Sequence, residues 1–404
     1  MAPVRTRWDI VAIAFAAGFM VGMQVGKVPP ALPMLQAELE LSRVVAGLIA
    51  SSYYAIGAVL GVAGGLLVDR LGIRRMVVVG GAAMALASAA GGFADSGGPL
   101  LAARIVEGFG FVTLTVAGPK MLVTAADAGV RRFLLGVWGT YMPIGIALSL
   151  VIATASLEAI GWRGLWLVNA GLILLFVAVF LWGAARKRWR APAVSGGGFD
   201  AAGVRAILAR PGPWLFGLSF AIFAVEWQAL MAWLPTFLIE TQARALTGAA
   251  LFTALFVLVT AAVSIACARL LQRGVARWPL LAITFAGMGV SAAALFAPFT
   301  PDDAKLPLAL CFALASGPLP AVCFEGGVAH APSPGQVAMA GGFVAQGAAL
   351  GAVLGPPLLA AVTEALGGWE AAWWTMLVWS SLGLAVAAGV WRADARLARL
   401  AAAA

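Results

Sequence analysis

The segment Gly65-Leu66-Leu67-Val68-Asp69-Arg70-Leu71-Gly72-Ile73-Arg74-Arg75 decides how this chain folds. It lies between two apolar stretches, each long enough to cross a bilayer as a helix of about 20 residues. Glycines let helix ends approach closely, Asp69 can accept hydrogen bonds from the start of a neighbouring helix, and the arginines stay in the cytosol. The pattern indicates a short cytosolic connection between two membrane-spanning helices.

The composition of the whole chain agrees with a membrane location. Of 404 residues, 62% are hydrophobic and 11% are charged, and the mean hydropathy is +0.98. A water-soluble globule cannot bury that much apolar surface, so we expect an all-α membrane protein. The 26 Lys and Arg outnumber the 17 Asp and Glu, but they are scattered over short connectors, which favours a role in membrane orientation over nucleic-acid binding. The three cysteines, Cys267, Cys311 and Cys323, form no C-x-x-C pattern, so they are interpreted as packing residues.

Charged and Pro/Gly-rich breaks divide the chain into twelve apolar segments of spanning length. We expect each to be a helix, because backbone that faces lipid must satisfy its own hydrogen bonds. The predicted spans are 9–33, 44–68, 75–93, 98–123, 133–156, 164–184, 213–237, 247–268, 278–298, 306–328, 337–362 and 371–391.

The distribution of basic residues predicts the orientation. With both termini inside, the cytosolic segments hold nineteen Lys or Arg, and the outer loops hold only Arg43, Arg163, Arg244 and Lys305. Because positive charge accumulates on the cytoplasmic side, we expect a multi-pass protein of the bacterial inner membrane with both termini in the cytosol. The amino-terminal apolar segment lacks an A-x-A-type cleavage site, so it is interpreted as a first span and not as a removed signal.

The chain also divides into two similar halves. The longest polar connector contains Arg186-Lys187-Arg188-Trp189-Arg190 and predicts a six-helix bundle over 1–184, a cytoplasmic linker over 185–212 and a second six-helix bundle over 213–404. An offset of 202 residues relates three pairs: Leu32-Pro33 with Leu234-Pro235, Gly72 with Gly274, and Arg75 with Arg277. This internal repeat predicts two bundles with pseudo-two-fold symmetry.

Three motifs carry a resemblance to the major facilitator superfamily. The segment Gly65–Arg75 resembles its cytoplasmic signature, G-x-L-x-D-R-x-G-x-R-R, and 104–110 resembles its R-x-x-Q-G-x-G motif with Glu107 in place of Gln. The antiporter signature G-P-x-x-G-G is matched only in part by 139–145, because Met142 replaces a Gly. The stretch Gly26–Pro33 is similar to bacterial permeases for cyanate and other small anions.

The resemblance implies transport by rocking of one bundle against the other, with helices 1, 4, 7 and 10 around a central cavity. It implies gating at the cytosolic face by Asp69, Arg70, Arg74 and Arg75. It also implies that the region of Arg104 takes part in proton coupling.

Ionisable residues within the spans are the candidates for a functional site, because a charge at membrane depth is retained where it lines water or finds a partner. Lys27 and Glu226 differ in depth by only about 4.5 Å, which allows a salt bridge or a shared substrate. Gln24 lies on the same helix face as Lys27, at the repeat position equivalent to Glu226. Two alternatives stay open: Lys27 can snorkel to the outer surface, and Glu226 can be a buried structural acid.

Arg104 and Glu107, three residues apart, either couple to protons or simply neutralise each other. Substrate arriving at Lys27 would release Glu226 to take up a proton, so we predict coupling by Glu226, Arg104 and Glu107. Aromatic and amide side chains supply further predicted substrate contacts, each with packing as the alternative. The predicted substrate-binding residues are Gln24, Lys27, Tyr54, Tyr141, Glu226, Trp227 and Gln346.

The chain shows no catalytic constellation. There is no Walker lysine loop, no cluster with metal-ligand spacing, and the single histidine, His330, lies in a predicted cytosolic loop. We therefore predict a monomeric secondary active transporter that needs no cofactor, coupled to protons and moving a small organic solute, preferably an organic anion, by symport. The main alternative is a proton-coupled efflux antiporter for hydrophobic compounds, and a membrane-embedded enzyme is a remote one.

Overall fold

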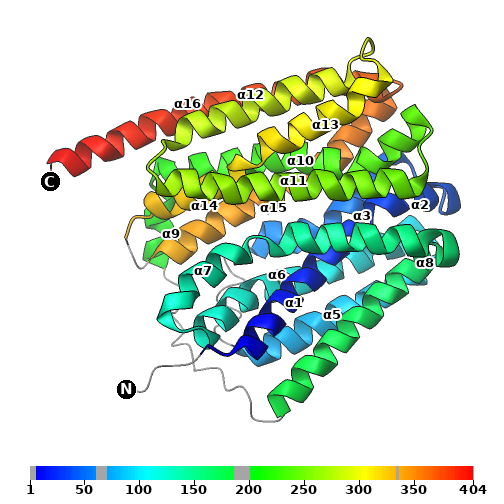
Figure 1. The fold of residues 1–404 in the computed structure, drawn as a ribbon, viewed down its shortest axis with the longest axis horizontal. Coiled ribbons are helices and arrows are strands. Elements are labelled where there is room, and N and C mark those ends of the chain that lie inside the picture. The colour runs from blue at the N-terminus through cyan, green and yellow to red at the C-terminus, as the bar shows by residue number, and fades with distance from the viewer. Residues whose placement is uncertain (1–5, 61–70, 186–200, 334–335, 404) are drawn as a thin grey trace. The chain divides into compact units, whose positions relative to one another are not determined.

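The computed structural model describes residues 6–60, 71–185, 201–333 and 336–403, and this part of the chain is helical without β-strands (Figure 1). Its α-helices are α1 (Trp8–Gly26), α2 (Leu32–Glu38), α3 (Arg43–Ser51), α5 (Ile73–Gly92), α6 (Gly97–Ala125), α7 (Ala128–Trp138), α8 (Tyr141–Ala185), α9 (Ala201–Leu208), α10 (Pro211–Gln242), α11 (Leu246–Gln272), α12 (Arg277–Phe296), α13 (Asp302–Ser316), α14 (Pro318–Ala329), α15 (Val337–Ala365) and α16 (Trp373–Ala403). Among the described residues there are also short 3-10 helices at Pro29–Ala31, Ser52–Tyr54 and Trp369–Ala372, and residues 55–60 are helical.

Eleven helical stretches of the described chain are long and apolar enough to cross a membrane. One of them, Tyr141–Gly183, has non-helical backbone at Gly161, where φ is 65°. Glycine adopts this conformation without a Cβ clash, and the kink there divides the stretch into two helices that fall in two different predicted spans. Each of the twelve predicted spans is mainly helical in the residues that the structure describes, and 61–68 of the second span lie outside them.

Three predicted spans are interrupted next to prolines, which lack a backbone donor. The span predicted over 306–328 is one of them, since α13 ends at Ser316 and α14 begins at Pro318. The span predicted over 133–156 is wrong as a single helix, since α7 ends at Trp138 and α8 begins at Tyr141. Pro143 has no N–H to donate to the carbonyl of Gly139, four residues earlier. In the first span, Pro29 and Pro30 end α1 at Gly26 and place a 3-10 turn before α2.

The predicted connector over 185–212 is partly helical. Within it, α9 occupies Ala201–Leu208. The basic cluster at 186–190 lies outside the described residues.

The chain divides into two compact units. One consists of Met1–Phe199 with Leu234–Ala254, and the other of Asp200–Trp233 with Leu255–Ala404. In the first unit α1 packs against α6 and α8, and α5 packs against the same two helices. In the second, α12 packs between α13 and α16, and α14 contacts α15 (Figure 1).

Close backbone contact between α1 and α8 positions the candidate site in the first unit. A Cβ built on Gly22 would lie 2.8 Å from the Cα of Gly145, a distance that no real side chain tolerates. Glycine at both positions lets the two helices touch. This contact fixes the last turns of α1, where Gln24 and Lys27 lie.

Candidate functional site

Lys27 lies at the carboxyl end of α1 and is completely enclosed. Its Nζ donates to Glu107 Oε1 at 2.7 Å, to Gln24 Oε1 at 2.6 Å and to Ser88 Oγ at 2.9 Å. The ammonium also lies 4.6 Å from the centre of the Trp166 ring, within range of a cation–π interaction. Neither Lys27 nor Glu107 has exposed side-chain surface, so the snorkelling interpretation of Lys27 is wrong.

Arg104 on α6 completes a buried charge cluster. Its Nη1 forms an ion pair with Glu107 Oε2 and donates to the backbone oxygen of Gln24 at 2.9 Å, while Nε donates to the backbone oxygen of Ile49 at 3.2 Å. The guanidinium also lies 4.8 Å from the ring centre of Tyr53. Glu107 therefore bridges two cations, and we call Lys27, Arg104 and Glu107 the charge cluster.

The charge cluster has more positive than negative charge. Two cations share one carboxylate, which leaves a formal excess of one positive charge at a place with no exposed side-chain surface. In addition, Arg104 Nη2 is buried and has no hydrogen-bond partner among the described residues. An unpaired buried donor on a cation is costly, so the cluster has the electrostatic and hydrogen-bonding capacity for an anion.

Uncharged polar groups hold the cluster in place. Gln24 Nε2 donates to Asn169 Oδ1 on α8 at 3.3 Å, and Asn169 Nδ2 donates to the backbone oxygen of Leu165. Ser88 Oγ on α5 donates to the backbone oxygen of Trp166 at 2.9 Å. These bonds give each polar group a defined orientation.

The predicted residues Gln24, Lys27, Arg104 and Glu107 are thus brought together within one unit. Ser88 and Asn169 were not predicted, because a single hydroxyl or amide in an apolar helix carries no distinguishing pattern. Tyr54 was the predicted contact, whereas its neighbour Tyr53 contacts Arg104. Tyr54 packs edge-on against Phe111.

The remaining predicted contacts lie elsewhere. Tyr141 stacks on Trp138 with ring centres 4.6 Å apart, and Trp227 Nε1 donates to Thr260 Oγ1 at 3.3 Å. Gln346 is half-buried on α15. None of these observations tests a role in substrate binding, so these roles stay predictions.

Glu226 lies in the second unit and has its own partner there. Its side chain has no exposed surface, and Ser380 Oγ on α16 lies 3.0 and 2.9 Å from its two oxygens. Lys27 and Glu226, which similar depth had suggested as partners, are each engaged within their own unit. The interpretation of Glu226 as a buried acid agrees with its environment.

At the start of α12, the repeat position of the predicted gating motif carries an ion-pair network. Arg277 at the start of α12 bonds Glu325 through Nη2 at 2.9 Å and Asp394 through Nη1 at 3.0 Å. His330 Nε2 lies 2.8 Å from the same Asp394 oxygen. The network joins α12, α14 and α16, and the role of Asp394 was not predicted.

The first copy of the motif is described only in part. Asp69 and Arg70 lie outside the described residues. Arg74 and Arg75 are exposed in the first turn of α5, which follows Gly72 at φ 78°. Their gating role stays a prediction.

Comparison with known proteins identifies the class. A family model described as Major Facilitator Superfamily matches residues 14–327, which is most of the chain. The chain therefore belongs to the major facilitator superfamily, a family of multi-pass membrane transporters, and the alternative of a membrane-embedded enzyme is wrong.

Individual relatives match over part of their length. The multidrug efflux pump LfrA of Mycolicibacterium smegmatis is 30% identical over 173 residues, which are 43% of this chain and 34% of LfrA. The probable sulfoacetate transporter SauU of Cupriavidus necator is 25% identical over 269 residues, which are 62% of each chain. The chain thus spans less than two thirds of the length of these relatives.

A solved structure confirms the fold. The inward-facing, occupied structure of a bacterial homologue of the lysosomal transporter Spinster aligns with a TM-score of 0.77, covering 96% of both chains at 15% identity. At this identity the likeness concerns the fold alone.

Proposed function

We propose that this protein is a proton-coupled secondary active transporter that moves a small organic anion across the bacterial inner membrane by alternating access between its two bundles. The observation that carries the proposal is the charge cluster, in which Lys27 and Arg104 share the single carboxylate of Glu107 without exposed surface. A buried positive charge without a counter-ion costs several kcal/mol. A bound anion would compensate it.

The same cluster suggests how proton and anion are coupled. A carboxylate or sulfonate that bonds Lys27 and Arg104 competes with Glu107 for both cations. Glu107, released into apolar surroundings, is then more stable as a neutral carboxylic acid, because an unpaired carboxylate there is costly. Binding of one anion thus favours uptake of one proton, which is the requirement for symport.

Gln24 belongs to this proposed site through its hydrogen bond to Lys27. Tyr54, Tyr141, Trp227, Gln346 and Glu226 are proposed as further groups along the substrate path. We retain a coupling role for Glu226 as a second proposal, distinguished from Glu107 by the experiment below. A monomeric state and cytosolic termini complete the proposal.

The similarity to SauU supports an anionic substrate, since that relative is named for an organic sulfonate. The similarity to LfrA supports the second candidate function, which is proton-driven efflux of hydrophobic compounds. The two functions differ in the charge of the cargo and in its direction relative to the proton gradient.

The test measures flux in proteoliposomes with an imposed proton gradient. Radiolabelled sulfoacetate should accumulate in wild-type vesicles. Glu107→Gln should abolish accumulation but preserve exchange of labelled for unlabelled sulfoacetate, because exchange moves no net protons. If Glu226→Gln shows exchange without accumulation, Glu226 also takes part in coupling. If Glu226→Gln still accumulates sulfoacetate, coupling is assigned to Glu107.

A panel of small carboxylates and sulfonates extends the assay if sulfoacetate is not a substrate. A rhodamine dye cation serves as the opposite probe. Dye movement against a proton gradient, with none of the anions accumulated, would contradict the anion proposal and establish the efflux function.

A further inference from the structure

One exposed face of α16 changes from apolar to basic along the helix. Its apolar part carries the exposed residues Trp374, Val378, Ala385 and Ala388. Its last turns carry three exposed arginines, Arg392, Arg396 and Arg399, which we call the arginine stripe. At about 100° of rotation per residue, all seven side chains lie within about 80° of one another around the helix axis. The apolar face and the arginine stripe therefore form one continuous surface.

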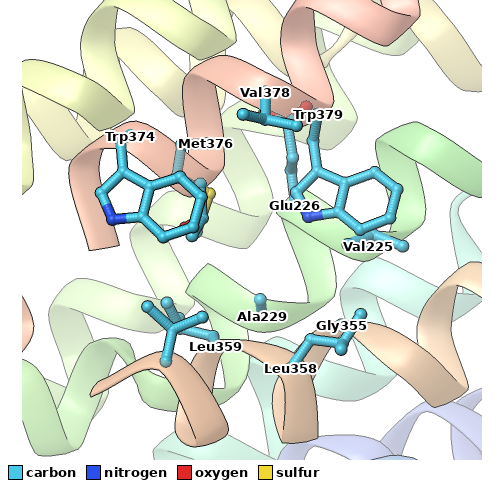
Figure 2. A pocket seen from close by; sticks show the side chains of 12 residues that line it. Val225, Glu226, Ala229, Gly355, Leu358, Leu359, Trp374, Met376, Val378 and Trp379 are labelled. Atoms are coloured by element: carbon cyan, nitrogen blue, oxygen red, sulfur yellow. The ribbon is translucent and has the colours of Figure 1, made fainter. Parts of the chain in front are cut away.

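The apolar part of this surface borders a cavity of about 230 Å³ between α10, α15 and α16 (Figure 2). Figure 2 shows Trp374 and Val378 on its α16 wall and Ala229 of α10 across from them. The lining is aliphatic and aromatic apart from Thr375 and Glu226, and Glu226 has no exposed surface. The cavity thus extends the apolar surroundings of α16, as is typical of a helix face that contacts lipid.

The length of α16 places the arginine stripe at the level of the lipid headgroups. The helix has 31 residues and is about 46 Å long, whereas the hydrocarbon core of a bilayer is about 30 Å thick. No ionisable residue lies between Trp373 and Trp391, and Arg392 follows directly. Trp391 and Trp278 of α12 are both exposed, with ring centres 6.2 Å apart, and tryptophan accumulates at membrane interfaces. The boundary of the hydrocarbon core therefore falls near Trp391.

The arginine stripe is not neutralised by the acid beside it in sequence. Asp394 lies on the opposite side of α16, where it bonds Arg277 at 3.0 Å and His330 at 2.8 Å. In the part of the chain that the structure describes, no ion pair joins the arginine stripe to an acid. Figure 1 shows the carboxyl end of α16 extending beyond the beginning of α12. Three positive charges on one helix face are therefore accessible to an anionic ligand.

We propose that the arginine stripe binds the headgroup of an anionic phospholipid, whose acyl chains lie along the exposed face at Ala388 and Ala385. The planar guanidinium matches a phosphate with two parallel hydrogen bonds. A lipid fits better than a soluble polyanion, because the arginine stripe continues the apolar face that contacts hydrocarbon. The site goes beyond the proposed transport function and does not depend on the transported solute.

Native mass spectrometry of the full-length protein in detergent tests the proposal. The two probes are palmitoyl-oleoyl phosphatidylglycerol and palmitoyl-oleoyl phosphatidylcholine, which share their acyl chains and their phosphate but differ in net charge. An arginine at the membrane surface strengthens binding to anionic lipid by about fivefold. Phosphatidylglycerol should therefore bind at least about tenfold more tightly than phosphatidylcholine.

Variants of the arginine stripe locate the site. Arg392→Gln/Arg396→Gln/Arg399→Gln should reduce the preference for phosphatidylglycerol by at least about tenfold, because the charge is lost. The corresponding triple lysine variant should retain most of the preference and lose part of it, since lysine keeps the charge without the planar fork. These residues are exposed, so thermal unfolding should show that the variants remain folded.

A matched control removes the same charge from other exposed arginines of the second unit. Arg210→Gln/Arg269→Gln/Arg273→Gln should leave the preference for phosphatidylglycerol unchanged. An equal loss in this control would show a general effect of charge and would overturn the proposal.

Two further results would also overturn it. They are equal binding of the two lipids by the wild-type protein, and an unchanged preference in the triple glutamine variant of the arginine stripe. Titration with inorganic phosphate distinguishes the source of the anion: displacement of phosphatidylglycerol by millimolar phosphate would assign the arginine stripe to a soluble anion instead of a lipid.

Discussion

The two repeats treat the same position in opposite ways. In the first unit Gln24 and Lys27 are enclosed in a network in which the lysine has three hydrogen-bond acceptors. In the second unit Glu226 has one hydroxyl partner and lies beside a cavity at Ala229. The same repeat position thus belongs to a network of several charged and polar groups in one unit and to a single carboxyl–hydroxyl pair in the other.

The largest effect on stability should come from opening the charge cluster. Glu107→Ala leaves Lys27 and Arg104 buried without a counter-ion, which should lower the free energy of unfolding by about 3–5 kcal/mol. Thermal unfolding in nanodiscs measures the loss. The double variant Lys27→Met/Glu107→Gln also removes the unpaired ammonium and leaves only Arg104 without its counter-ion, so it should recover part of the loss. A double variant as unstable as Glu107→Ala would contradict the pairing of Lys27 with Glu107.

A smaller effect on stability is expected at Glu226, the buried acid of the second unit. Glu226→Gln preserves an acceptor for Ser380 and leaves no opposite charge unpaired, so the free energy of unfolding should change by about 1 kcal/mol or less. The same unfolding assay applies. A loss as large as that of Glu107→Ala would show that both repeats are closed structural networks and would break the comparison.

The starts of α5 and α12, which are repeat-equivalent, give a third contrast. Arg277→Gln removes contacts to Glu325 and Asp394, which are partly exposed, so it should cost about 1 kcal/mol. Arg75, 202 residues earlier, is exposed, and Arg75→Gln is the matched variant with a smaller expected loss. Equal losses would indicate that Arg75 has an unobserved partner of similar strength.

The smallest expected effect on stability concerns Asp127, an acid outside the membrane spans. The hydroxyl of Thr6 and the backbone N–H groups of Val130 and Gly129 donate to Asp127, which lowers the pKa of its carboxyl below the usual value of 3.8. A lowered pKa in the folded state stabilises the protein above the unfolded pKa, and this contribution disappears as the pH falls through the folded pKa. Stability should therefore decline below about pH 4.

Asp127→Ser isolates this contribution. Serine keeps a side-chain acceptor at the start of α7 but does not titrate, so the variant should lose stability less steeply than wild type on acidification. Thermal unfolding between pH 3 and pH 6 gives both slopes. Identical slopes would remove Asp127 from the pH dependence and leave the buried acids as its source.

The helices, the repeat and four members of the first network could be predicted because the signals were strong. Spanning length identifies the helices, and ionisable residues in apolar segments are conspicuous, as Lys27 and Glu107 show. Depth along a helix axis did not identify the partner of Lys27, because depth does not say toward which neighbouring helix a side chain points. It therefore suggested Glu226 for Lys27, whereas the structure pairs Lys27 with Glu107.

Other features of the structure had only weak signals in the sequence, or signals that the prediction did not use. Ser88 and Asn169 resemble any isolated polar residue in a helix, so only the three-dimensional contacts reveal them. The break between α7 and α8 was detectable from Pro143, since proline cannot donate to the carbonyl of Gly139. Asp394 joins Arg277 across 117 residues, a separation for which sequence spacing offers no rule.

The bonds from Arg104 to Gln24 and Ile49 have a consequence for how this protein can diverge. Both acceptors are main-chain oxygens, which every amino acid provides. Substitution at position 49 leaves its acceptor chemically unchanged, whereas replacement of Arg104 removes the links from α6 to both α1 and α3 at once. The hydrogen bond at position 49 therefore tolerates any residue that fits this buried position, whereas the donor at position 104 has no substitute in the main chain.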